Sequence, residues 1–144
     1  MTTINITFTL DTTDAAASLG FEAWVDDVKF IDVEHVDAAL PAEIVLADDE
    51  AEHELRLVMK GKTTQHTRVD EAGEIVSDAC LTISRLAFDE IELKQVFVDQ
   101  ATYTHDFNGT GETTETKFYG TLGCNGVVSL KFSTPMYVWL LEHM

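Results

Sequence analysis

An alternation of apolar and polar residues with a period of two dominates the sequence. Ile4, Ile6, Phe8 and Leu10 alternate with polar residues, and the same pattern returns many times along the chain. Successive side chains of a strand point to opposite faces, so this period predicts strands with one buried face. Candidate strands follow at residues 21–25, 28–33, 44–46, 53–60, 81–88, 91–94, 101–107, 117–122 and 127–132.

Turn signals separate these strands at intervals of roughly 8–12 residues, the spacing of a β-sandwich or barrel. The apolar phase shifts around Ser84 and Arg85, as a β-bulge would shift it. The chain has 144 residues and only two prolines, with no linker or repeat between its strands. We therefore predict an all-β fold, a single antiparallel, jelly-roll-like β-sandwich that forms one domain over residues 1–144.

Two short segments could be helical. Thr134 before Pro135 is typical of a helix N-terminus, so residues 137–142 are expected to form a short C-terminal helix. A last strand is the alternative, because Tyr, Val and Trp also suit strands. A second, weaker helix candidate covers residues 14–19, with Gly20 as its stop.

The charge balance excludes some classes of function. Nine Lys and Arg residues face 26 Asp and Glu residues, a formal net charge of -17. Such a surface repels phosphate, so we expect neither a nucleic-acid partner nor an anionic membrane partner. The densest acidic run, residues 48–54, is interpreted as a solvated hairpin tip, with a cation site or a docking surface for a basic partner as the alternative.

Cysteine and histidine spacing point to no metal or redox motif. Cys80 and Cys124 belong to no C-x-x-C pair. We expect two buried free thiols, and a disulfide between them is the alternative. The five histidines show no paired ligand spacing, so a zinc site would need residues from remote strands. No nucleophile-elbow, P-loop or dinucleotide-binding motif occurs, and we expect no enzyme activity. The first residues carry no basic stretch followed by an apolar run, so no signal peptide is expected.

Residues 106–112 resemble the first half of an EF-hand calcium loop. Asp106 and Asn108 stand at its first and third positions, but Lys117 stands where the bidentate glutamate belongs. No helix is expected on either side, so an EF-hand is not predicted. A calcium site held by a sandwich loop remains a hypothesis, with Asp99, Asp106 and Asn108 as ligands. The alternative is a polar hairpin loop whose glycines make the turn.

Two aromatic residues are candidate sugar-binding side chains. Trp24 faces away from Phe21 on its strand, and Tyr119 faces away from Phe118 beside Gly120. A sugar ring stacks its C–H face on Trp or Tyr, while carboxylates and amides bind its hydroxyl groups. The alternative for each aromatic is half-buried packing.

Four runs resemble small acidic proteins of tailed phages that infect marine cyanobacteria. They are HELRLVMKGK at residues 53–62, TYTHDFNGT at 102–110, KFYGTLGCNG at 117–126 and FSTPMYVWLLE at 132–142. The resemblance implies a phage origin and a location in the host cytoplasm or the virion, and it implies no activity.

A second similarity is to calcium-dependent xylan-binding modules. The segment AWVDDV at residues 23–28 and the acidic segment from Asp99 to Asn108 are similar to parts of these jelly-roll proteins, in which a calcium ion coordinates sugar hydroxyl groups. The sequence thus leads to a non-catalytic, carbohydrate-binding module of phage origin, with calcium as a candidate cofactor. The alternative is a virion accessory or host-interaction protein with no glycan ligand.

Overall fold

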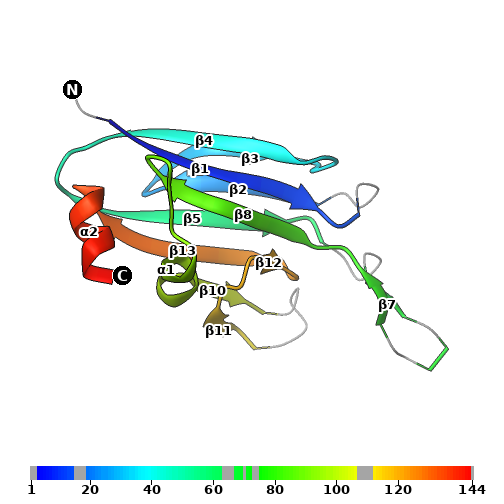
Figure 1. The fold of residues 1–144 in the computed structure, drawn as a ribbon. Helices are drawn as coiled ribbons and strands as arrows, with labels where there is room; N and C mark the ends of the chain where they lie inside the picture. The colour runs from blue at the N-terminus through cyan, green and yellow to red at the C-terminus, as the bar shows by residue number, and fades with distance from the viewer. Residues whose placement is uncertain are drawn as a thin grey trace.

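The chain folds into two antiparallel sheets that stack as a sandwich (Figure 1). A computed structural model describes residues 3–14, 19–62, 67–69, 71–72, 75–106 and 112–143. One sheet has the order β12-β8-β1-β4, with β9 paired to β8. Its strands are β1 (Thr3–Thr12), β4 (Leu40–Ala47), β8 (Leu81–Phe88), β9 (Ile91–Glu92) and β12 (Thr121–Leu122).

The second sheet has the order β11-β10-β13-β5-β2-β3. Its strands are β2 (Gly20–Val25), β3 (Val28–Val33), β5 (Glu52–Lys60), β10 (Thr102–His105), β11 (Thr114–Lys117) and β13 (Gly126–Ser133). A separate hairpin, β6 (Thr67–Val69) with β7 (Ile75–Asp78), extends beyond the sandwich at one end (Figure 1). The predicted antiparallel β-sandwich is confirmed.

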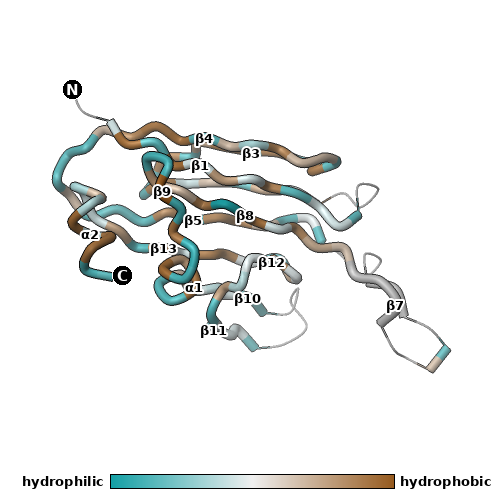
Figure 2. Tube along the Cα trace, viewed as in Figure 1, coloured by the Kyte–Doolittle hydropathy of each residue, from teal (hydrophilic) through white to brown (hydrophobic). Residues whose placement is uncertain are grey.

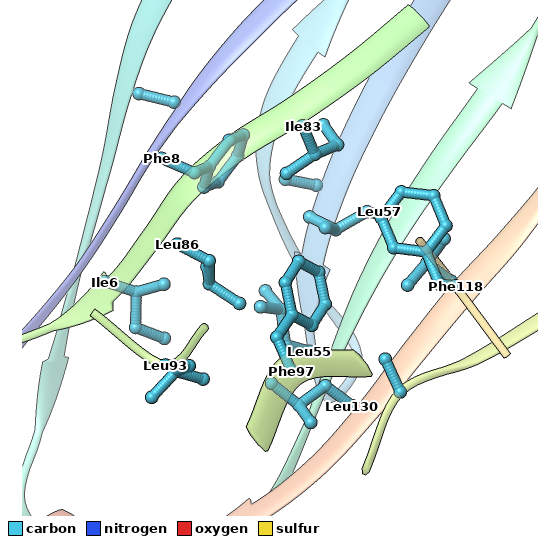
Figure 3. Packing of buried hydrophobic residues seen from close by; sticks show 14 of the residues in the cluster. Ile6, Phe8, Leu55, Leu57, Ile83, Leu86, Leu93, Phe97, Phe118 and Leu130 are labelled. Atoms are coloured by element: carbon cyan, nitrogen blue, oxygen red, sulfur yellow. The ribbon is translucent and has the colours of Figure 1, made fainter. Parts of the chain in front are cut away.

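The core lies between the two sheets and follows the period of two. All four apolar residues that define the first strand are buried in β1, and Leu55, Leu57 and Met59 are buried in β5. Figure 2 shows the resulting alternation of apolar and polar residues along the strands. Figure 3 shows side chains of both sheets meeting in the core, such as Ile6 and Phe8 with Leu55 and Leu57.

The predicted β-bulge is confirmed in β8. Thr7 of β1 pairs with Ala87 and Thr9 pairs with Ser84, so the register shifts between the two pairs. Arg85, inside the shift, has a positive φ of 59°. The bulge turns two consecutive residues, Ser84 and Arg85, toward solvent.

The predicted C-terminal helix is confirmed as α2 (Met136–His143), and it packs at one end of the sandwich (Figure 1). It buries Met136, Trp139 and Leu140. A second helix, α1 (Gln95–Gln100), was not predicted. The candidate helix over residues 14–19 falls mostly outside the described residues.

The strand predicted over residues 117–122 is wrong. β11 ends at Lys117 in one sheet and β12 begins at Thr121 in the other, so the three residues between them carry the chain across the sandwich. Gly120 has a φ of 105°, a conformation that glycine adopts without steric cost. This crossing segment creates the pocket described below.

Two further findings bear on the sequence interpretation. Cys80 and Cys124 form no disulfide, and both are half-buried rather than buried.

No helix in the described part of the chain has the length and apolar character of a membrane span.

Candidate functional site

A pocket opens beside the crossing segment, and we name it the Tyr119 pocket. Its volume is about 180 Å³. Its walls come from β8, β9, α1 and the segment between β11 and β12. The lining residues are Ile83, Arg85, Leu86, Glu92, Lys94, Phe97, Val98, Phe118, Tyr119 and Gly120.

The floor of the Tyr119 pocket is apolar and its edge is aromatic. Leu86, Phe97 and Phe118 are buried there, and the rings of Phe97 and Phe118 lie 5.5 Å apart (Figure 3). Tyr119 is 77% exposed, the largest exposed fraction among the exposed large hydrophobic residues of the described chain. Its ring therefore presents an uncovered aromatic surface beside an apolar floor, with three charged residues, Arg85, Glu92 and Lys94, among the remaining lining.

Trp24 lies elsewhere, on the outer face of β2 in the six-stranded sheet. Its indole Nε1 donates a hydrogen bond of 2.9 Å to the Glu22 carboxylate. Lys29 Nζ and Arg56 Cζ lie 5.5 and 5.6 Å from its ring centroid. Trp24 pairs with Lys29 of β3 on one side and with Arg56 of β5 on the other. The two cations therefore flank the ring from opposite sides. A sugar that stacks on Trp24 would have to displace one of these cation–π contacts.

The structure separates two of the three predicted calcium ligands. Asp99 lies in α1, where Gln95 donates a 3.0 Å hydrogen bond to its carboxylate and Lys117 Nζ lies 3.8 Å from the same oxygen. Asp106 follows the other end of β10, and a strand advances by about 3.3 Å per residue. Asp99 and Asp106 thus lie at opposite ends of β10, while Asn108 lies outside the described residues.

The described residues alone do not assemble a calcium site. They contain no group of three or more His, Cys, Asp or Glu side chains that could hold a metal ion. Calcium binds six to eight oxygen ligands at about 2.3–2.6 Å, so one carboxylate at the end of β10 does not suffice.

A second, larger cleft of about 700 Å³ lies near α2, and we name it the His53 cleft. His53 Nδ1 lies 2.7 Å from Asp26 and Nε2 lies 2.8 Å from Asp49. Thr134 also donates a 3.2 Å hydrogen bond to Asp49. Besides His53 and Asp26, the residues that line the cleft include Ser133, Trp139 and His143.

The geometry favours the protonated form of His53. Ionised carboxylates only accept hydrogen bonds, so while Asp26 and Asp49 are ionised this geometry favours the protonated imidazole, in which both ring nitrogens donate. Partial burial lowers the pKa of His53, but hydrogen bonds to Asp26 and Asp49 outweigh it and raise the pKa above its usual value. The hydrogen bond from His53 lowers the pKa of Asp49, against a smaller opposing effect of burial. Ser133 shares the cleft, yet His53 has no free nitrogen to accept its proton.

This cluster predicts a specific dependence of stability on pH. The His53 contribution is complete below the unfolded pKa of about 6.5 and is lost as pH rises through the higher folded pKa. The Asp49 contribution is present above about pH 3.9 and is lost as pH falls through its lower folded pKa. We therefore expect His53→Gln to lower the free energy of unfolding most between about pH 4 and 6.5, by about 1 kcal/mol because both carboxylates are half exposed.

Thermal melts of wild type and His53→Gln at pH 5.5 and 9 measure this effect. His143→Gln is the matched control, since the His143 ring contacts the Trp139 carbonyl oxygen at 2.7 Å instead of two carboxylates. An equal loss at both pH values in His53→Gln would contradict the account.

Sequence reasoning identified Tyr119 but missed the residues around it. The unusual position of Arg85 was detectable in the sequence, because the alternation of apolar residues shifts at Ser84 and Arg85. Lys94 and Phe97 carried none, because α1 is too short to show a helical period. The Asp26–His53–Asp49 cluster had no signal beyond the acidic run, since the β2–β3 turn and the β4–β5 loop bring the two carboxylates to His53 of β5.

The comparisons with known proteins concern the fold. No family model matches the chain, and no curated protein matches its sequence. A solved structure, the selenomethionine form of vCBM60, is similar in fold; it is described with two families of calcium-dependent carbohydrate-binding modules linked by circular permutation. Its TM-score is 0.54 at 11% identity, over 88% of this chain and 89% of that chain. The sandwich of this protein is therefore similar in fold to that module.

Proposed function

We propose that the protein is a non-catalytic carbohydrate-binding module whose ligand occupies the Tyr119 pocket. The observation that carries the proposal is the 77% exposed ring of Tyr119 beside an apolar floor, on a fold shared with a carbohydrate-binding module. An exposed aromatic ring offers the C–H face of a sugar a stacking surface. The charged groups beside it supply hydrogen bonds for hydroxyl groups.

The size of the pocket supports a small ligand unit. Pockets for drug-sized ligands are about 300–1,000 Å³, and the Tyr119 pocket has about 180 Å³. One sugar ring or one chain end fits this volume better than several consecutive rings. Trp24 is the second candidate platform, but its flanking cations compete with a sugar for its ring.

The larger cleft does not place a general base on Ser133. Both ring nitrogens of His53 are hydrogen-bonded to carboxylates, so neither is positioned to accept a proton from Ser133. A binding role needs no such base.

Calcium dependence is a separate part of the proposal. The similar structure belongs to a calcium-dependent class, and Asp106 with Asn108 would be the ligands nearest to one another along the chain. Glycan retention measured with calcium, with magnesium and with a chelator tests it at constant ionic strength, which keeps screening of the -17 charge equal. Retention that needs calcium and is lost in Asp106→Ala and Asn108→Ala supports the ion; retention unaffected by the chelator would contradict it.

The test of the central proposal is retention on immobilised polysaccharides in native affinity gels. Tyr119→Ala removes the stacking surface and should weaken retention by roughly 5- to 30-fold, equivalent to about 1–2 kcal/mol. Tyr137→Ala is the matched control, because Tyr137 is 55% exposed on α2 and lines none of the pockets described above.

Retention by wild type and by Tyr137→Ala, with loss in Tyr119→Ala, supports the proposal. Equal retention by both variants would contradict the assignment of the pocket. No retention by wild type on any polysaccharide would contradict the function.

A protein-interaction role is the second candidate, and α2 favours it. Tyr137, Val138 and Leu141 of α2 are all more than half exposed, so this helix presents apolar side chains to solvent. Such exposure suits contact with another protein, as a virion accessory or host-interaction protein would need. Mass spectrometry of purified virions and a pull-down that compares wild type with Leu141→Asp test this role.

A further inference from the structure

Two positively charged side chains, Arg85 and Lys94, line the Tyr119 pocket of a strongly acidic protein. The chain has nine Lys and Arg residues against 26 acidic ones. Four cations form ion pairs with carboxylates; they are Lys29, Arg56, Lys60 and Lys117. By contrast, the side chains of Arg85 and Lys94 have no ion pair or hydrogen bond within the described residues, and both line the pocket.

The backbone directs both cations outward. Without the bulge in β8, the alternation from Ile83 would turn Arg85 toward the core, but the bulge exposes it. Lys94 precedes α1 with a positive φ of 48°, and Arg85 has a φ of 59°. Non-glycine residues rarely adopt such angles, and they cluster at functional sites when the surrounding structure holds them there.

We infer that the Tyr119 pocket selects an acidic sugar, a uronate or a sulfated unit, whose anionic group binds Arg85 and Lys94. This inference rests on the proposed carbohydrate-binding function and names its ligand class. A guanidinium binds a carboxylate or sulfate with two parallel hydrogen bonds, and an ammonium adds a point charge. The sugar ring then lies against Tyr119 over the apolar floor.

Two features oppose the binding of an anion, and they determine how binding should depend on salt. Glu92 lines the same pocket, and the net charge of -17 repels an anion at long range. At 0.15 M salt the Debye length is about 8 Å, so the long-range repulsion is screened while the direct contacts are screened less. Acidic-sugar binding should therefore need physiological salt, and it should depend on the two cations in direct contact.

The experiment compares polygalacturonate with neutral galactan in affinity gels at 0.15 M salt. Wild type should bind the acidic polymer at least ~10-fold more tightly, the effect of a hydrogen bond to a charged group. Arg85→Gln and Lys94→Gln should each remove most of this preference, because retention on the acidic polymer should fall more than retention on the neutral one. Lys131→Gln is the matched control, since Lys131 lines the His53 cleft instead. Melting temperatures close to wild type show that the variants are folded.

The outcomes separate this inference from the proposed function. Preference for the acidic polymer that falls in both pocket variants, but not in Lys131→Gln, supports it. Equal binding of both polymers, or a preference unchanged by Arg85→Gln and Lys94→Gln, overturns the inference and leaves the carbohydrate-binding function standing. Absence of binding to either polymer and to all other glycans overturns both.

Discussion

Phe88→Ala should lower the free energy of unfolding by about 3–5 kcal/mol, the cost of a large cavity in a packed core. Phe88 is fully buried at the end of β8. Its ring meets Phe132 of the opposite sheet at 4.9 Å and Trp139 of α2 at 6.0 Å. One side chain thus joins both sheets and the C-terminal helix, and neighbours held by two sheets cannot collapse fully into its space.

Thermal or denaturant unfolding measures this loss. At about 2–4 °C per kcal/mol, the Tm should fall by roughly 6–20 °C. Phe30→Ala is the matched control, because Phe30 lies on the edge strand β3 and is 41% exposed; its Tm should change little. Similar losses in the two variants would mean that Phe88 does not join the sheets as described.

Gly126→Ala should destabilise the six-stranded sheet by about 1–3 kcal/mol or more, the cost of overpacking a fixed site. Gly126 opens β13 and pairs with His105 of β10 on one side and with Met59 of β5 on the other. A Cβ at this position would collide with the Thr104 carbonyl oxygen and lie 2.9 Å from His105 Cβ. The close contacts all come from β10, so this strand has to move and its pairing with β13 is weakened.

Gly123→Ala is the control for this substitution. A Cβ at Gly123 meets no atom within 4 Å, so alanine should be tolerated there within about 0.5 kcal/mol. Unfolding curves of the two variants make the comparison. A Gly126→Ala protein as stable as wild type would show that β10 and β13 are not packed as tightly as described.

The period of two was enough to predict the sandwich, because each strand has one face in the core. β1 and β5 show this most clearly, since every second residue is buried from Ile4 to Leu10 and from Leu55 to Met59. The bulge at Arg85 was predictable for the same reason, because it breaks the alternation. Short segments without a full period were not predictable. α1 spans six residues, fewer than two helical turns, and its Val96 and Phe97 read equally well as part of a strand.

The candidate site was predictable only where one residue carries its own signal. Tyr119 stood out because it precedes a glycine and faces away from Phe118. The pocket around it depends on the chain crossing between sheets at residues 118–120, and no local pattern distinguishes that crossing from a continuous strand. Arg85 and Lys94 meet there only after β8 and α1 are packed together. The contacts of His53 were unpredictable for the same reason, because its two partners lie 27 and 4 residues away in different loops.

The most direct test of carbohydrate binding at the Tyr119 pocket is an amide NMR titration with an oligosaccharide that the protein retains. The account predicts that the largest chemical-shift changes fall on Gly120, Phe118 and Phe97, at the floor and rim of the pocket. Changes centred on Trp24 and its strand neighbours, or on the His53 cleft, would contradict it and move the binding site to another face of the sandwich.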